Sequence, residues 1–154
     1  MKLGKSLSFA IALCLMLAMG SVKSEAQEYG HHPAYLHALS DLRLMRAYLD
    51  RPTPNDRIDD DSTRAIGEID AAIQAIKEAS IDDHKDLRDH MPIDARVTPV
   101  ERYRKAREAG NAAWHDVDQE EDNGYARDLK HRALDHIEAA NHIVDHIIHR
   151  YEHE

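Results

Sequence analysis

Apolar residues recur every three or four positions along residues 124–153, which is the spacing of one face of an α-helix. This apolar stripe consists of Ala126, Leu129, Ala133, Ile137, Ala140, Val144, Ile147 and Tyr151. Histidines and carboxylates follow the same steps on the opposite face, at His131, Asp135, Glu138, His142, His146, His149 and His153. At about 100° per residue these polar positions fall within an arc of about 80°. The pattern predicts a long amphipathic helix that packs by its apolar stripe and carries a histidine stripe on its back.

Two earlier segments show the same helical spacing. The first begins at Pro33, a residue suited to a first helical turn, and its apolar face is Tyr35, Ala38, Leu39, Leu42, Met45 and Leu49. Arg46 falls on that face near the helix end, where we expect it to reach solvent or pair with an acidic side chain. After a turn over residues 51–56, we expect a second helix to start at Ser62 and Thr63, with acidic residues 59–61 before it. Its packing seam is Ile66, Ile69, Ile73 and Ile76.

A third helix has a strong start signal, with Thr98 as the N-cap, Pro99 in the first turn and Glu101 completing a capping box. We expect it to bury Tyr103, Ala106, Gly110, Ala113, Trp114 and Val117. The small residues in this set form one strip, so a neighbouring helix can approach closely. An acidic turn over residues 119–124 follows, in which Asn123 can cap the fourth helix.

The order of these elements predicts an all-α fold. No stretch alternates polar and apolar residues as a strand does. A charged segment of about 18 residues, Ser80–Val97, connects the second and third helices. We therefore predict an antiparallel four-helix bundle with a longer crossover between its second and third helices. The alternative is a pair of helical hairpins that completes its core only as a homodimer.

The first 26 residues are expected to be a secretory signal peptide. Lys2 and Lys5 precede an uncharged, largely apolar run over residues 7–20, and Ser24–Ala26 is a small-x-small cleavage site, with Gly20 as an alternative. The alternative interpretation is an uncleaved anchor, although the run is short for a membrane span. We predict a bundle domain over residues 27–154 that is exported, either to a periplasm or out of the cell. Because Cys14 lies in the apolar run, the mature domain has no cysteine for disulfides or thiolate metal sites.

The charge of the chain restricts its partners. The 154 residues carry a net charge of −9 with neutral histidines, and removal of residues 1–26 moves this to −11. Nucleic acid is excluded as an expected partner because its phosphates would be repelled. Cations are favoured, and the 12 histidines, six of them after residue 130, change charge between about pH 5 and 8.

The histidine stripe is the strongest candidate for chemistry. His142 and His146 are four residues apart, as are His149 and His153, so each pair can reach one ion from one helix. Neutral imidazoles suit Cu, Ni and Zn, and Asp145 can complete a coordination sphere. Since His142 and His153 are about 16 Å apart along a helix, one ion cannot use all four. The pattern predicts two or more open metal sites, and the competing interpretation is a solvated polar face.

Other cofactor chemistries find less support. A di-iron bundle needs Glu-x-x-His elements, which do not occur in this sequence. A haem bundle could nominally use Met45 and His136, but we expect Met45 to pack in the core and His136 to be a satisfied boundary histidine. Residues 82–86 lack the Gly and Glu of a calcium loop. The sequence shows no nucleophile–base arrangement and no Gly-rich phosphate loop, so an enzyme is not expected.

Three stretches carry a resemblance to known proteins: YLHALSDLRLMR (35–46), IDDHKDLRDHMPID (81–94) and DVDQEEDNGYARDL (116–129). In that order they resemble a group of uncharacterised exported bacterial helical bundles, which implies a four-helix fold and an envelope location but no activity or catalytic residues. HRALDHIEAANHIVDHIIH (131–149) is similar to the last helix of small periplasmic His-rich metal-binding bundles, although the first three helices here have few histidines.

Two functions follow as hypotheses. The first is a non-enzymatic exported bundle that binds or buffers divalent metals through its last helix. The second is an envelope protein-binding or stress module, with Leu36, Leu44 and the surroundings of Trp114 as candidate contacts. An exposed, contiguous apolar patch would favour the second. A haem-binding bundle is a weaker third hypothesis.

Overall fold

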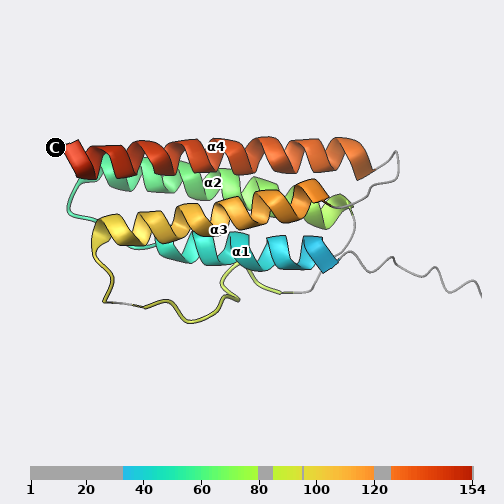
Figure 1. The fold of residues 1–154 in the computed structure, drawn as a ribbon, viewed down its shortest axis with the longest axis horizontal. Coiled ribbons are helices and arrows are strands. Elements are labelled where there is room, and N and C mark those ends of the chain that lie inside the picture. The colour runs from blue at the N-terminus through green and yellow to red at the C-terminus, as the bar shows by residue number, and fades with distance from the viewer. Residues whose placement is uncertain (1–32, 80–84, 95, 120–125, 154) are drawn as a thin grey trace, which may run out of the picture.

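A computed structural model describes residues 33–79, 85–94, 96–119 and 126–153 of the chain. These residues form four α-helices, α1 (Pro33–Leu49), α2 (Asp56–Ala79), α3 (Pro99–Gln119) and α4 (Ala126–His153), and no strand. All four helices extend along the long axis of the molecule (Figure 1). The prediction of an all-α, four-helix fold is therefore confirmed. The longest connection between helices is residues 80–98, as the sequence predicts.

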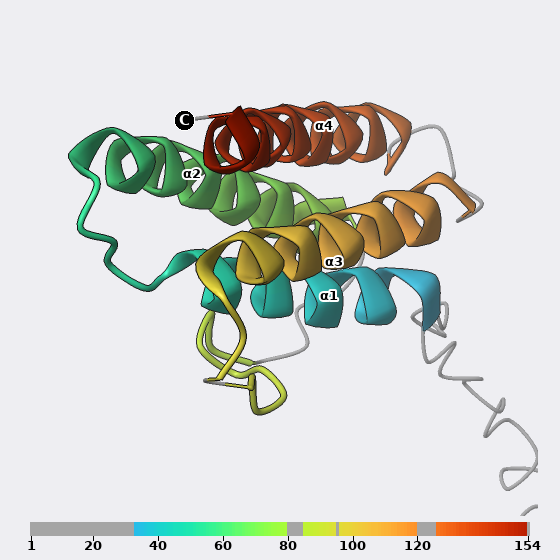
Figure 2. The ribbon, with the colours of Figure 1, turned by 60° about the vertical axis from the view of Figure 1, so that its left-hand side comes forward.

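Each helix packs on two of the others. α2 contacts α1 and α4, and α3 contacts α1 and α4, so α1 and α4 occupy one diagonal of the cross-section and α2 and α3 the other (Figure 2). The start of α2 lies beside the end of α4, where Arg150 Nη1 is 3.2 Å from Asp61 Oδ2. At the other end of this pair, Arg132 Nη1 is 3.9 Å from Glu78 Oε2.

The predicted apolar stripes form one core. Its fully buried large side chains include Tyr35, Leu39, Leu42, Met45, Leu49, Ile69, Ile73, Ile76, Tyr103, Ile137 and Ile147. Full burial of an aliphatic side chain stabilises the fold by about 1.5–3 kcal/mol, so the stripes provide the main driving force for association of the helices. Two expectations need correction. Trp114 is half-buried at the edge of the core, and Leu44 is half-buried and packs on it.

The second helix begins six residues earlier than the sequence analysis predicts. Asn55 caps it: its Oδ1 accepts hydrogen bonds from the backbone N–H groups of Arg57 at 3.2 Å and Ile58 at 3.4 Å. Acidic residues 59–61 therefore lie inside the first turns, where the helix dipole favours negative charge, rather than ahead of the helix. Ile58 is buried and extends the α2 seam by two turns. The third helix begins as predicted, with Thr98 Oγ1 accepting from Glu101 N–H at 3.3 Å.

Polar side chains are also buried between the helices, which the hydrophobic pattern does not reveal. At the end where α2 and α3 begin, Tyr103 Oη lies 3.1 Å from Ser62 Oγ and accepts a hydrogen bond from Arg102 Nη2 at 3.0 Å. Arg43 on α1 and Asn141 on α4 are likewise buried. Arg46 pairs with Asp70 of α2, with Nε donating to Oδ1 at 2.9 Å, which confirms the acid-paired interpretation.

The predicted signal peptide falls outside the described residues, because the description begins at Pro33. So do the predicted cap Asn123 and residues 82–84 of the acidic connection. Within the described part of the chain, no helix is long and apolar enough to cross a membrane.

Candidate functional site

The predicted metal ligands lie on the exposed side of α4. His142, His146, His149, His153 and Asp145 are all exposed. Their side chains have different neighbours, and they divide into three groups: one directed to α3, one directed to α2 and one at the C-terminal end of α4.

The C-terminal group is the pair His149 and His153. Their rings stack in parallel, with centroids 4.1 Å apart and an interplanar angle of 2°. His153 Nδ1 lies 3.0 Å from the backbone carbonyl oxygen of His149. Because a carbonyl only accepts, this Nδ1 carries the proton, and in the neutral ring Nε2 is left with a free lone pair. A metal ligand of the common Nε2 type is therefore available at this end of α4.

Two of the other predicted ligands, Asp145 and His146, are engaged by neighbouring helices. Asp145 Oδ1 accepts from Arg107 Nε of α3 at 2.8 Å, so its charge is already compensated. His146 Nδ1 is 3.8 Å from Asp61 Oδ2 of α2, and Asp61 is also within ion-pair distance of Arg150. Among the described residues, no three His, Cys, Asp or Glu side chains come together in a way that could hold a metal ion. Any site on α4 therefore has at most two protein ligands from the described part of one chain.

His136 behaves as the sequence analysis predicts. It is half-buried on α4, and its Nδ1 donates to Glu68 Oε2 of α2 at 2.7 Å. Met45, the other nominal haem ligand, is fully buried and packs beneath Gly110 of α3. Neither side chain lines the pocket between α3 and α4. The geometry therefore offers no support for a haem site built from this pair.

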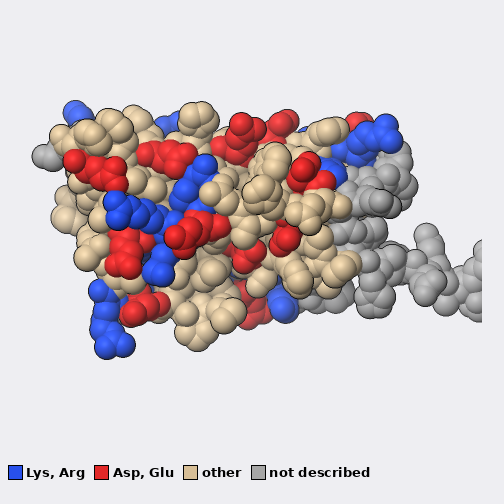
Figure 3. All heavy atoms as spheres, viewed as in Figure 1, with Lys and Arg blue, Asp and Glu red and all other residues tan. Residues whose placement is uncertain are grey.

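The surface around α3 and α4 carries both signs of charge. Figure 3 shows acidic and basic side chains interspersed across this face rather than gathered in a patch of one sign. Cross-helix ion pairs account for part of this pattern. Arg104 Nη2 donates to Glu152 Oε1 at 2.5 Å, and this bond is the main reason that the pKa of Glu152 is lowered.

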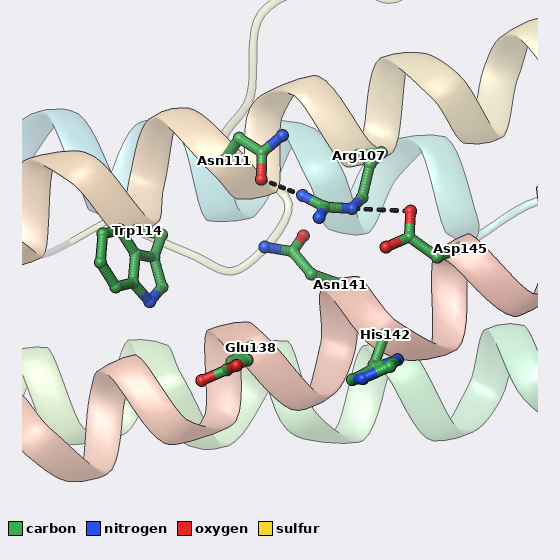
Figure 4. Close-up of a pocket in the computed structure, with 7 residues that line it drawn as sticks. All are labelled: Arg107, Asn111, Trp114, Glu138, Asn141, His142 and Asp145. Atoms are coloured by element: carbon green, nitrogen blue, oxygen red, sulfur yellow. Dashed lines mark hydrogen bonds and ion pairs between the residues drawn. The ribbon is translucent and has the colours of Figure 1, made fainter.

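A pocket of about 280 Å³ opens between α3 and α4. Its lining residues are Arg107, Asn111 and Trp114 from α3 and Glu138, Asn141, His142 and Asp145 from α4 (Figure 4). Arg107 bridges the two helices by donating to Asp145 of α4, and it also donates to Asn111 Oδ1 of its own helix. Two of the predicted metal ligands, His142 and Asp145, therefore border a pocket that contains a guanidinium group.

Asn141 forms the buried part of this pocket and is only 5% exposed. Its Oδ1 has no hydrogen-bond partner among the described residues, and a buried polar atom left unsatisfied costs about 1–3 kcal/mol. The space that it occupies exists because residue 110 is glycine. A Cβ at that position would lie 2.1 Å from Asn141 Oδ1 and 2.9 Å from Met45 Sδ. The close helix approach predicted from the small-residue strip of α3 is confirmed at this point.

Comparison with protein-family models, with curated proteins and with solved structures found no match to this chain. The resemblances to exported bacterial bundles and to His-rich metal-binding bundles stay predictions.

Three residues of the pocket, Arg107, Asn111 and Asn141, were not predicted from the sequence as site residues. Asn141 falls between the apolar and histidine stripes of α4, and helical periodicity assigns such a boundary position to neither. One signal was present: Gly110 is the single position without a side chain in the buried strip of α3, so a neighbouring side chain can enter there.

Proposed function

We propose that this protein is an exported, non-enzymatic, antiparallel four-helix bundle that binds and buffers divalent transition metals through histidine pairs on α4. The observation that supports the proposal is the proximity of His149 and His153 on an exposed helix end, with ring centroids 4.1 Å apart, so that rotation of one stacked ring about its side-chain bonds would aim both imidazoles at one ion. The proposal includes the signal peptide expected over residues 1–26, because an exported protein meets metals before the cell interior does.

Binding by pairs suits buffering better than permanent retention. Two imidazoles leave the remaining coordination positions of Cu(II), Ni(II) or Zn(II) to water, so ions can exchange. For nitrogen ligands the expected order of affinity places Cu(II) first. The net charge of −9 raises the local concentration of cations near the surface.

The rival proposal of a protein-binding module depends on a contiguous apolar surface. The exposed large apolar side chains of the described residues are Leu36, 37% exposed on α1, and Met91, 71% exposed in the connection between α2 and α3. Two side chains on separate elements make a small apolar surface compared with the several hundred Å² typical of docking patches. Metal binding is therefore the function that we favour.

Calorimetric titration of the purified protein with Cu(II), Ni(II) and Zn(II) tests the proposal. The double substitution His149→Gln/His153→Gln should weaken Cu(II) binding about tenfold or more, because both imidazoles of the proposed chelating pair are removed. The matched control removes two exposed histidines from different elements, in His90→Gln/His131→Gln, and should leave the affinity unchanged.

Two results would contradict the proposal. One is an equal loss of affinity in the paired and control variants, which would indicate binding by scattered imidazoles. The other is an unchanged affinity after His142, His146, His149 and His153 are all replaced by glutamine.

A further inference from the structure

The pocket between α3 and α4 has two chemically different ends. In Figure 4, Arg107 and Asp145 lie on one side of Asn141, and Trp114 and Glu138 lie on the other. At the first end the charges cancel, because Arg107 Nε donates to Asp145 Oδ1 at 2.8 Å. At the second end Glu138 has neither an ion pair nor a hydrogen bond with any described residue. With His142 counted as neutral, the pocket therefore carries one uncompensated negative charge, and it lies at the Trp114 end.

The aromatic wall at this end favours a cation. Trp114 is half-buried, so one part of its indole is fixed by the core while another part remains accessible. Indole faces attract cations more strongly than other aromatic side chains do. A ligand that places a positive charge between this ring and the Glu138 carboxylate would gain from both. An anion would instead meet Glu138 and the net charge of −9.

Asn141 supplies the hydrogen-bonding group between the two ends. It is nine-tenths or more buried, and its Oδ1 accepts no hydrogen bond from the described residues. Figure 4 shows its amide nitrogen directed toward the Trp114 side and its oxygen toward Arg107. The two amide atoms exchange places by a half-turn about the terminal side-chain bond, and their assignment follows the hydrogen-bond network. In the orientation drawn, a ligand on the Trp114 side meets the amide N–H₂ group, and the half-turn would place the amide oxygen there as an acceptor for a ligand N–H.

From this juxtaposition we propose that the α3–α4 pocket binds a small organic ammonium compound with N–H donors, of the alkylamine or diamine class. Trp114 holds the cationic group by its ring face, Glu138 pairs with its charge, and the Asn141 amide, turned so that its oxygen faces the Trp114 end, accepts a hydrogen bond from it. The volume of about 280 Å³ lies just below the range of sites for drug-sized ligands, which restricts the ligand to a compact molecule. This site uses neither His149 nor His153, so it is separate from the proposed metal pair.

Trp114 also provides the assay, because it is the single tryptophan of the chain. We would titrate the full chain, in the presence of a metal chelator and at constant ionic strength, with 1,4-diaminobutane, tetramethylammonium and succinate. The diamine should change the tryptophan emission in a saturable way. Tetramethylammonium, a cation without N–H donors, should bind more weakly than the diamine by a factor of about ten or more. Succinate, an anion of similar length, should produce no saturable change.

Variants distinguish diamine binding in the pocket from non-specific attraction of a cation to an acidic surface. Glu138→Gln should weaken diamine binding about tenfold, whereas Glu108→Gln, which removes an exposed carboxylate of α3 outside the pocket, should not change it. Trp114→Leu, followed by calorimetry, should weaken binding as well. The metal-pair variant His149→Gln/His153→Gln should bind the diamine normally, so failure of one proposal does not imply failure of the other.

The proposal is overturned by equal diamine affinity in the Glu138 and Glu108 variants, because binding would then depend on net charge alone. It is also overturned if succinate binds as well as the diamine, or if the diamine leaves both the tryptophan emission and the calorimetric heat unchanged.

Discussion

Gly110 and Gly67 provide a matched pair of substitutions that tests the packing between α3 and α4. Both are helical glycines, but their surroundings differ. A Cβ at Gly110 would lie 2.1 Å from Asn141 Oδ1 and 2.9 Å from Met45 Sδ, whereas a Cβ at Gly67 on α2 would meet nothing within 4 Å. The same Gly→Ala change therefore adds a methyl group to a filled interface in one case and to open space in the other.

The expected magnitudes have opposite signs. Alanine is favoured over glycine inside a helix by about 0.8–1 kcal/mol, so Gly67→Ala should stabilise the protein by about that amount. At Gly110 the same gain is opposed by overpacking, which costs about 1–3 kcal/mol. Both Asn141 and Met45 would have to move, and both are buried in the interface. We therefore expect Gly110→Ala to lower the free energy of unfolding by up to about 2 kcal/mol.

Urea denaturation followed by circular dichroism measures both changes, and thermal melting should show shifts of about 3–5 °C per kcal/mol. The double substitution Gly110→Ala/Asn141→Ala tests the stated cause. Once the amide is absent, alanine at position 110 should lose most of its penalty, so the two changes should be strongly non-additive. The reasoning is refuted if Gly110→Ala stabilises the protein as much as Gly67→Ala does.

Two further predictions concern a buried tyrosine and a half-buried aspartate. Tyr103→Phe should lower the free energy of unfolding, measured by urea denaturation, by about 1–3 kcal/mol, because Arg102 and Ser62 both lose a buried partner. Ser62→Ala should lower it less, since Tyr103 keeps the bond from Arg102. Equal losses in the two variants would contradict this network. Burial, and then the charge of Asp116, raises the pKa of Asp41 above its ordinary 3.8. The protonated form is therefore favoured in the folded state, and the free energy of unfolding falls as pH rises through the folded-state pKa. Asp41→Asn should therefore raise the free energy of unfolding at about pH 7 and leave it almost unchanged at about pH 3, and a decrease at neutral pH would count against this assignment.

Much of the fold could be predicted because helix burial is periodic. Of the apolar positions assigned to the face of α1, Tyr35, Leu39, Leu42, Met45 and Leu49 are all buried. Ridge-like packing of one helix on another uses every third or fourth side chain, so the spacing alone identifies the face. The predicted start of α2 was wrong, because three consecutive aspartates give no apolar spacing there. The helix nevertheless includes them, since Asn55 caps its first turn and Ile58 is buried in the core.

The candidate sites could be predicted less completely because they depend on contacts between helices. The histidine stripe is visible in the sequence, but its division is not: Asp145 turns to Arg107 and His146 lies near Asp61 only because α3 and α2 flank α4. The proposed diamine pocket depends on Gly110 of α3 facing Asn141 of α4 at the interface between these two helices. No periodicity within one helix contains that information.

The diagonal placement of α2 and α3 has a consequence for the length of chain between them. Ser62 Oγ and Tyr103 Oη lie 3.1 Å apart, and both residues are in the first half of their helices, so the chain must return along most of the bundle after α2 ends. At 1.5 Å per helical residue this return, together with the crossing of the diagonal, is about 35 Å. An extended chain spans about 3.3 Å per residue, so about eleven residues would be enough.

Residues 80–98 provide 19, which is longer than this geometric minimum. The connection is therefore about eight residues longer than the shortest chain that could span this distance. Sequence in this part of the protein can lengthen, shorten or acquire its own contacts without changing the order in which the four helices meet.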